Sequence, residues 1–403
     1  MESSILVRGV RFMIYLDNAA TTKVRREVLD EMLPYFSEYY TNPSSIYSPS
    51  RMVSKRVEEA RKLIAGTIGA EASEIYFTSG GSESDNWAIK KIMISRMNKG
   101  KHMITTKVEH HAVLESCKYL ESLGFEVTYL NVNEDGLIDL NELENSIRED
   151  TILVSIMAAN NEIGTLMPLK EIGDICKKHK VLFHTDAVQA YGNIPIDVNE
   201  MNIDFLSTSA HKIEGPKGIG FLYVRKGVMI IPLISGGMQE KGKRAGTTNA
   251  PGIIGFAKAA ELKFSEMEKN NEYVLNLREH LIDRVLSEIP YVRLNGSRDK
   301  RLVGNANFSF QFIEGEGMLL KLDALGICAS SGSACTSGSL DPSHVLLAIG
   351  LPHEIAHGSL RLTMNHENTM EEIDYTVDKL KEVISGLRSM SPLYEDFIKK
   401  GSN

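Results

Sequence analysis

Short apolar segments alternate with amphipathic ones along the first two thirds of the chain. The short segments are rich in β-branched and aromatic residues, which favours strands. We expect strands at residues 75–78, 102–105, 126–130, 152–157, 181–184, 205–207 and 219–224. Because these strands are largely apolar and are separated by helical segments, the pattern indicates an α/β domain built on a mainly parallel sheet.

The amphipathic segments repeat their apolar residues at three- and four-residue spacing, which predicts helices. These helices are expected at residues 86–97, 112–123, 140–147 and 169–178, with a longer charged helix at 254–289. The pattern after it predicts a smaller α+β region, with strands at 307–312 and 359–363 and helices at 316–325 and 370–388. We therefore expect a large domain at 15–262 and a small domain at 263–403, with residues 1–14 as an extension that packs on the small domain.

Composition places the chain among ordinary globular proteins and argues against several classes of function. Of its 403 residues, 42% are hydrophobic and 24% are charged, and the net charge of −8 argues against a nucleic-acid partner. No apolar window is long enough for a membrane span, and residues 1–12 lack the apolar core of a signal peptide. Four cysteines without a CxxC pair predict neither a disulfide scaffold nor a structural zinc site. We expect a cytoplasmic protein that holds no metal.

One cysteine, Cys335, lies in the run Ser-Ser-Gly-Ser-Ala-Cys-Thr-Ser-Gly-Ser at 330–339. A structural thiol prefers apolar neighbours, whereas an exposed thiol on a mobile segment can reach a substrate and then a partner. A Ser/Gly run is more often a plain linker, so the run alone leaves both interpretations open. Cys328 ends an apolar run, and we expect it in the core.

Small and polar residues follow several predicted strands, at the edge where open α/β sheets bind ligands. The turn at 79–83 (Ser-Gly-Gly-Ser-Glu) could hold an anion on backbone N–H groups or could simply cap a helix. Asp186 and Gln189 follow one strand, and Lys212 follows the next. A lysine, an acid and an anion-binding turn are what pyridoxal phosphate requires. Each residue alone is more often a surface or turn residue, but the combination favours this cofactor.

Further motifs extend the pattern from residue 15 to residue 394. They are Leu-Asp-Asn-Ala-Ala-Thr-Thr at 16–22, Asn-Pro-Ser-Ser at 42–45, Thr-Ser-Gly-Gly-Ser-Glu-Ser-Asp-Asn at 78–86, Glu-His at 109–110, Asn-Asn-Glu-Ile-Gly at 160–164, His-Thr-Asp-Ala-Val-Gln at 184–189, Ser-Ala-His-Lys at 209–212 and the cysteine run. With these motifs the chain resembles the NifS/IscS group of cysteine desulfurases, which are class V aminotransferase-like enzymes. The resemblance implies an α/β fold, the transferase fold of pyridoxal-phosphate enzymes (aspartate aminotransferase fold type I).

The resemblance also implies roles for individual residues. Lys212 would form the Schiff base with pyridoxal 5'-phosphate and move protons, while His110 would stack on the ring and act in acid–base steps. Cys335 would take the sulfur as nucleophile. The cofactor-binding residues that the resemblance implies are Gly81, Ser82, His110, Asn161, Asp186, Gln189, Ser209, His211, Lys212 and Thr247, the last from across a homodimer interface. Asn161 and Arg361 would bind the carboxylate of the substrate, although a surface ion pair would also account for Arg361.

The implied reaction converts L-cysteine to L-alanine, with the sulfur held as a persulfide on Cys335 and passed to an acceptor protein such as an iron–sulfur scaffold. The run around Cys335 resembles that of the mobile-loop subgroup. Ser82 stands where the family commonly has threonine, and Ala210 where it commonly has glycine, but neither departure removes a functional group. An aminotransferase or a selenocysteine lyase of the same fold is the alternative enzyme, and a non-catalytic scaffold is the alternative from another class.

Overall fold

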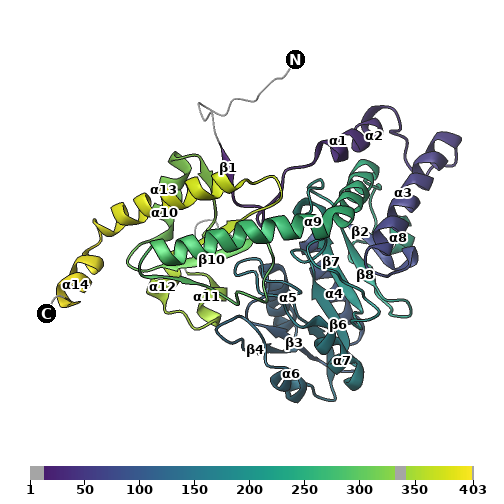
Figure 1. Cartoon of the computed structure of the whole chain (residues 1–403). Coiled ribbons are helices and arrows are strands. Elements are labelled where there is room, and N and C mark those ends of the chain that lie inside the picture. Colours follow the sequence, from purple (N-terminus) through teal and green to yellow (C-terminus); the bar gives the residue numbers. More distant parts are fainter. Residues whose placement is uncertain (1–12, 332–341, 402–403) are drawn as a thin grey trace.

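A seven-stranded sheet forms the centre of the computed structural model, which describes residues 13–331 and 342–401 (Figure 1). Its strand order is β2-β8-β7-β6-β5-β3-β4. The strands are β2 (Ile75–Thr78), β3 (His102–Thr106), β4 (Glu126–Leu130), β5 (Thr151–Ser155), β6 (Leu182–Asp186), β7 (Phe205–Ser209) and β8 (Gly220–Val224). Among these strands β8 alone runs against its neighbours, so the others all end at one edge of the sheet.

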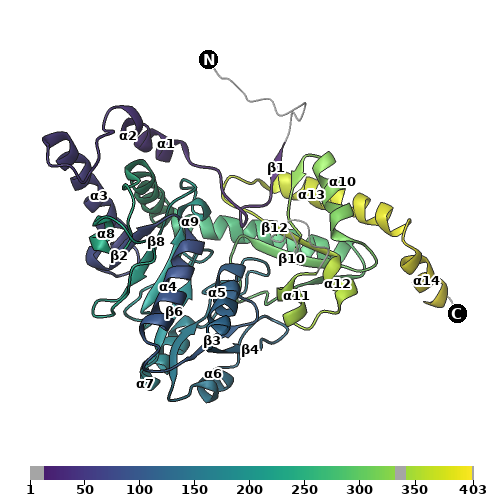
Figure 2. The ribbon, with the colours of Figure 1, turned by 180° about the vertical axis from the view of Figure 1, so that it is seen from behind.

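Helices cover both faces of this sheet, because successive side chains along a strand point to opposite sides. In β3, Met103 shares a core with α4 (Gly81–Ser95) and α5 (His111–Ser122), while the next residue, Ile104, belongs to the core of the other face. That second face carries α3 (Ser48–Gly66), α7 (Leu169–His179) and the start of α9 (Ala250–Glu288) (Figures 1 and 2). The remaining helical segments of this part are α1 (Arg26–Met32), α2 (Pro34–Ser37), η1 (Ala72–Glu74), α6 (Leu140–Ser146), η2 (Ala210–Lys212) and α8 (Gln239–Gly242).

The C-terminal part has a core of its own. An antiparallel sheet in the order β12-β10-β9 forms one side of it, and α9 connects it to the large sheet, since Ile253 lies in the first core and Leu281 in the second. Its elements are β9 (Val292–Leu294), β10 (Asn305–Phe310), α10 (Gly315–Ala324), β11 (Ile327–Cys328), α11 (His344–Ala348), α12 (His353–His357), β12 (Ser359–Thr363), α13 (Met370–Arg388) and α14 (Pro392–Gly401). The proposed domain boundary at 262/263 falls inside the continuous helix α9 and stays a prediction.

The N-terminal segment crosses between the two parts. Its strand β1 (Ile14–Tyr15) pairs in parallel with β11 of the C-terminal part. The chain then passes Thr363, which forms a bridge with Asp17, and reaches the large sheet, where the Thr22 N–H donates to the carbonyl of His211 at 2.9 Å. Residues 14–22 therefore contact both parts. The expectation that residues 1–14 pack on the C-terminal part stays a prediction, because residues 1–12 lie outside the described residues.

The elements differ from the expected ones mainly at their ends. The strand expected at 152–157 is β5 (Thr151–Ser155), and the helix expected at 86–97 already begins at Gly81. Helix α14 was not predicted. The expectation that Cys328 is a core residue is wrong, because its two-residue strand pairs with β1 on one side only and leaves the thiol partly exposed. None of the helices in the described ranges combines the length and the apolar character that a membrane span requires.

Candidate active site

Neighbouring strands deliver polar side chains to the carboxyl edge of the large sheet. His110 follows β3, Asn161 follows β5, and Asp186 is the last residue of β6. Ser209 ends β7, and Lys212 ends the helical turn η2 directly after it. Parallel strands end at a common edge, so residues far apart in sequence meet there. The structure therefore brings together the residues that their positions after strands had singled out.

A surface hollow lies between the ends of β2 and β7. Its lining residues are Thr21, Ser79, Gly80, Gly81, Ser82, Glu83, Ser209, His211, Lys217 and Gly218. No described side chain caps the first turn of α4, so the N–H groups at its start can bind an anion. A Cβ on Gly81 would lie 2.4 Å from Cγ2 of Val188, which explains the glycine. Burial lowers the pKa of His211 to about 4, helped by the neighbouring lysines 212 and 217, so this imidazole is neutral at pH 7.

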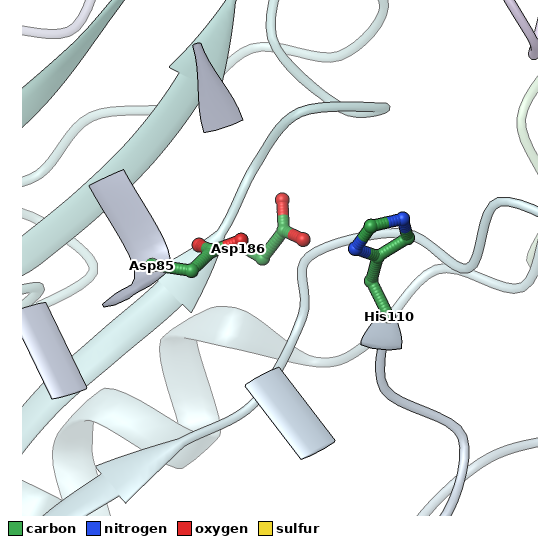
Figure 3. A group of neighbouring side chains, drawn as sticks. All are labelled: Asp85, His110 and Asp186. Atoms are coloured by element: carbon green, nitrogen blue, oxygen red, sulfur yellow. The ribbon is translucent and has the colours of Figure 1, made fainter. Parts of the chain in front are cut away.

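Two carboxyl groups and one imidazole form the base of the site (Figure 3). One ligand-type atom from each of Asp85, His110 and Asp186 lies within 4.8 Å of the other two. The Oδ1 atom of Asp186 accepts from the N–H of Val188 at 2.9 Å. Burial raises the pKa of Asp186, although the nearby His110 and Lys212 oppose this shift. The base of the site is thus a buried acidic surface.

His110 is held by the backbone of the helix that follows it. It is the N-cap of α5, and its Nδ1 atom accepts from the N–H of Ala112 at 3.1 Å. An imidazole nitrogen that accepts a hydrogen bond carries no proton, so the neutral ring carries its proton on Nε2. Burial lowers the pKa of His110, which favours this neutral form. The ring of His111 lies 6.4 Å away, and His344 packs on His111 at 4.8 Å between ring centroids.

The side chain of Lys212 reaches the N-terminal segment. Its Nζ atom donates to the carbonyl of Ala19 at 2.5 Å and to that of Ala20 at 2.7 Å. The Nε2 atom of Gln189 donates to the same Ala19 carbonyl at 3.0 Å. Lys212 and Gln189, both predicted to contact the cofactor, are therefore held by the same backbone segment at residues 19–20.

Arg361 lies in β12 and is nearly buried, at 4% exposure. Its Nη1 atom donates to the backbone carbonyl of Asn161 at 2.8 Å, and its Nη2 atom forms an ion pair with Oδ1 of Asp17 at 2.9 Å. The buried Nε atom has no hydrogen-bond partner among the described residues. Arg361 thus contacts the large sheet through the backbone of Asn161, not through the side chain of that residue. The Nε–H group of Arg361 remains available for a further hydrogen bond.

The comparisons with known proteins agree with this geometry. The family model described as Aminotransferase class-V matches residues 14–376. A relative from Methanosarcina thermophila, "Cysteine desulfurase IscS", is 56% identical over 380 residues, which is 94% of each chain. The chain belongs to the cysteine desulfurase family. A solved "NIFS-like protein" has a TM-score of 0.88 at 40% identity and covers 93% of this chain and 100% of its own. The solved structure "SspA in complex with cysteine" has a TM-score of 0.78 at 39% identity, covering 88% and 99%.

Cysteine desulfurases of class V depend on pyridoxal phosphate, and the residues of this chain fit that group. The hollow at the uncapped start of α4 suits a phosphate, since the N–H groups of this helix start have no side-chain cap and the hydroxyls of Ser82 and Ser209 line the same hollow. The carboxyl of Asp186 is buried and has no ion-pair partner among the described residues, which suits a protonated ring nitrogen. Lys212 interacts electrostatically with Asp186 and directly follows His211, which lines the hollow, so it can supply the amine for the aldehyde.

Two predicted site residues stand apart from this cysteine desulfurase site. Cys335 lies outside the described residues, which end at Ser331 and resume at residue 342. Thr247 is exposed on the loop before α9 and is not among the residues that line the hollow of this single chain. Its predicted contact from a second copy of the chain stays a prediction.

Sequence reasoning did not single out Asp85, Asp17 and Glu109 as functional residues. Asp85 and Asp17 appeared inside motifs, but nothing in the motifs indicated that the one faces Asp186 and the other Arg361. Glu109 is fully buried directly before His110, and burial raises its pKa to about 8 although Met157 N–H and the Thr106 hydroxyl both donate to it. An acid next to a predicted catalytic histidine is the signal that could have marked it.

Proposed function

We propose that this protein releases sulfur from L-cysteine, forms L-alanine and transfers the sulfur as a persulfide on Cys335. The observation that carries the proposal is the joint placement of Lys212, Asp186 and the anion hollow at one sheet edge, with Arg361 bonded to Asn161 beside them. The solved neighbour that holds cysteine supports this choice of substrate. Pyridoxal phosphate, when bound, supplies an aldehyde for the amine of the substrate and a ring that accepts electrons from its α-carbon.

Arg361 orients the substrate. A guanidinium binds a carboxylate through two parallel hydrogen bonds, and Arg361 has both a buried unused Nε–H and an ion pair that another carboxylate can replace. Its bond to the carbonyl of Asn161 fixes the plane of the guanidinium relative to the large sheet. The carboxylate of L-cysteine therefore binds on the side of β12, with its amine toward Lys212.

Lys212 moves the proton of the α-carbon. The two carbonyls of Ala19 and Ala20 lie at hydrogen-bond distance from its Nζ atom and can hold the ammonium that forms when the amine takes up this proton. Gln189 donates to the same Ala19 carbonyl and so fixes its position. The lysine then has a defined resting place while the substrate reacts.

His110 is placed to donate a hydrogen bond through Nε2. Because Nδ1 accepts the Ala112 N–H, the neutral ring presents an N–H group at its other nitrogen. This arrangement favours a hydrogen bond from His110 to the substrate over removal of a proton from the thiol, because Nδ1 is already occupied and a neutral ring that lost its Nε2 proton would become an imidazolate. A role for His110 as the base for Cys335 would require the loss of the Ala112 hydrogen bond.

The sulfur transfer balances without an external reagent. The thiolate of Cys335 attacks the sulfur of the substrate, a new S–S bond forms and the Cβ–S bond breaks. The electron pair of the broken bond stays with the carbon skeleton, and a proton added there completes the methyl group of L-alanine. An unperturbed thiol with a pKa of about 8.5 is only a few per cent ionised at pH 7, so the reaction depends on the deprotonated fraction.

The test replaces Cys335 with alanine. The wild type is expected to form sulfide and L-alanine in equal amounts from L-cysteine with a thiol reductant, and Cys335→Ala is expected to lose both products. Cys176→Ala is the matched control, because Cys176 is buried within α7, where its thiol is shielded from a substrate. Wild-type rates in Cys335→Ala contradict the assignment, and a requirement for a keto acid without sulfide release favours an aminotransferase.

The proposal extends to the partners and the compartment of the protein. Large apolar side chains of residues 33–46 are exposed, with Phe36 at 61%, Tyr40 at 72% and Ile46 at 88%, which supports a homodimer through this surface. A cytoplasmic site of action and transfer of the sulfur to an acceptor protein for iron–sulfur cluster assembly complete the proposal. Sedimentation of the purified protein at the mass of one chain contradicts the dimer.

A further inference from the structure

Asp85 is a buried acid for which the proposed reaction has no role. It lies in α4, on the side of Asp186 away from His110, with 1% of its surface exposed (Figure 3). Its Oδ1 atom is buried and has no hydrogen-bond partner among the described residues. A buried ionised carboxylate normally has a cation or several donors, so this one needs another explanation.

The groups that face Asp85 provide no cation. Asp186 and His184 come from β6, Ser207 from β7, and Glu109 and His110 from the connection between β3 and α5. The nearest basic atom is Nε2 of His184, 3.6 Å from Oδ1 of Asp85.

This imidazole is itself neutral. Burial lowers the pKa of His184 to about 3, and its two ring nitrogens already contact the hydroxyls of Ser155 and Ser207 at 2.8 and 3.0 Å. Asp85 therefore has no ion-pair partner among the described residues that is charged at neutral pH.

Two buried carboxyl groups with oxygens within 4.8 Å of each other repel when both are charged, so the pair keeps one proton. The surroundings decide which group keeps it. Asp186 accepts a backbone hydrogen bond and lies near Lys212 and His110, all of which favour its charged form. For Asp85, burial and the charge of Asp186 both raise its pKa, and only the Ser207 hydroxyl opposes them.

We propose that Asp85 is a positioning residue that carries the shared proton of the Asp85–Asp186 pair and so keeps the negative charge on Asp186, toward the ring nitrogen of the cofactor. The inference rests on the proposed role of Asp186. A second charge on Asp85 would repel that of Asp186 and weaken its defined contact with the ring. Asp85 acts through Asp186 and touches neither substrate nor cofactor in this scheme.

The direct test reads the protonation of Asp85 by infrared spectroscopy on the full-length chain labelled with ¹³C at its aspartate carboxyl groups. The cofactor-free wild type is expected to show the band of a protonated aspartic acid at pH 7.5, and the band is expected to disappear at alkaline pH. In Asp85→Asn the band should be absent. A wild type without the band at pH 7.5, or a band that persists in Asp85→Asn, overturns the proposal.

A second readout uses the visible absorbance of the bound cofactor. At alkaline pH, ionisation of Asp85 in the wild type is expected to add a spectral step that Asp85→Asn lacks, because the amide cannot ionise. Identical titrations of the two proteins overturn the proposal. A wild type that binds no cofactor or forms no L-alanine contradicts the proposed function instead, and the infrared result on the cofactor-free chain still stands or fails by itself.

A matched control separates a neutral Asp85 from a charged one. Glu240 is also largely buried, with 8% of its side chain exposed, but it is paired with the guanidinium of Arg61 at 2.6 Å, so Glu240→Gln leaves this buried cation with the exposed Glu58 as its charged partner. Thermal unfolding at pH 8 is expected to show a clear loss for Glu240→Gln and none for Asp85→Asn. An equal loss in both variants contradicts a protonated Asp85.

Discussion

The two sides of the site differ in whether their buried charged groups have ion-pair partners. The base of Asp85, Asp186 and His110, with Glu109 close by, has buried acids that form no ion pair with a charged cation among the described residues. The arginine side, formed by Arg361 and Asp17, has a buried cation that already holds an internal carboxylate at 2.9 Å. The base is therefore stabilised most by a ligand that brings a positive charge, such as a protonated ring nitrogen. The arginine side can only exchange one carboxylate for another.

This difference has an energetic consequence. A buried acid whose pKa is raised costs stability at neutral pH, and a cationic ligand that binds the folded state recovers part of that cost. A satisfied ion pair costs less in the free protein, but the incoming carboxylate must compete with Asp17. The favourable free energy of ligand binding thus comes mainly from the base. The arginine side mainly determines which carboxylate binds.

The variant Glu109→Gln is expected to have the largest effect. It tests whether the buried acids at the base lack a cation that offsets their charge. The folded-state pKa of Glu109 is about 8, far above its value in an unfolded chain, so the folded state keeps a proton that the unfolded state loses. The contribution of Glu109 to the free energy of unfolding should therefore fall as pH rises from about 4 to about 8, by a total of about 5 kcal/mol at about 1.4 kcal/mol per pKa unit. Chemical denaturation across this range should show a much flatter profile for Glu109→Gln.

The control for this slope is Glu288→Gln. The pKa of Glu288 is lowered to about 2 by hydrogen bonds from Arg284 and Lys381, so its contribution to stability is present at neutral pH and lost as pH falls toward 2. This variant should differ from the wild type on the alkaline side by a constant amount only. If the free energy of unfolding depends on pH with the same slope in wild type and Glu109→Gln, the buried charge of Glu109 does not lower stability.

The next effect tests whether the arginine side receives the substrate, through Arg361→Ala. Loss of a bidentate charge-assisted contact is expected to lower kcat/KM for L-cysteine about 10²-fold, or about 3 kcal/mol. Arg284→Ala is the matched control, because Arg284 forms ion pairs with Glu288, Asp374 and Asp378 on helices α9 and α13 outside the site. A fall of less than tenfold in Arg361→Ala would place the carboxylate elsewhere.

The smallest effect tests whether Asp17 competes with the substrate. In Asp17→Asn the internal carboxylate is gone, so the product L-alanine should bind about threefold more tightly, or about 0.7 kcal/mol by titration calorimetry. The control is Asp30→Asn, which breaks the exposed pair with Arg26 and should leave the affinity unchanged. Weaker binding in Asp17→Asn would mean that Asp17 orients the guanidinium and does not compete for it.

The sequence predicted those parts of the molecule that follow from local pattern. Apolar runs located the strands, and positions after strands located Asp186, Gln189 and Lys212, since the ends of parallel strands share an edge, whereas His110 came from the family resemblance. The start of α4 was placed five residues late because the Ser-Gly-Gly-Ser turn reads as a loop, although it forms the first turn of the helix. Local propensity is weakest at such helix ends.

The uncompensated acids could not be predicted in the same way. Asp85 lies on the face of α4 toward the sheet, where a helical pattern expects apolar residues, and nothing in the sequence shows that Ser207 and Asp186 face it. The pair of Asp17 and Arg361 joins residues separated by 344 positions. Contacts of this kind depend on the assembled fold, and no spacing rule along the chain contains them.

The contacts of residues 14–22 also set the order in which the site can form during synthesis and refolding. Ile14 pairs with Ile327, and Asn18 donates to the carbonyl of Thr363, so these contacts must wait until more than 300 further residues have emerged. Closing so long a loop is entropically costly and slow compared with local folding. The large sheet can therefore fold early, while the carbonyls that hold Lys212 are ordered last. In a truncated or stalled chain, Lys212 would lack its ordered hydrogen-bond acceptors, the carbonyls of Ala19 and Ala20. In a refolding experiment, activity should appear later than secondary structure.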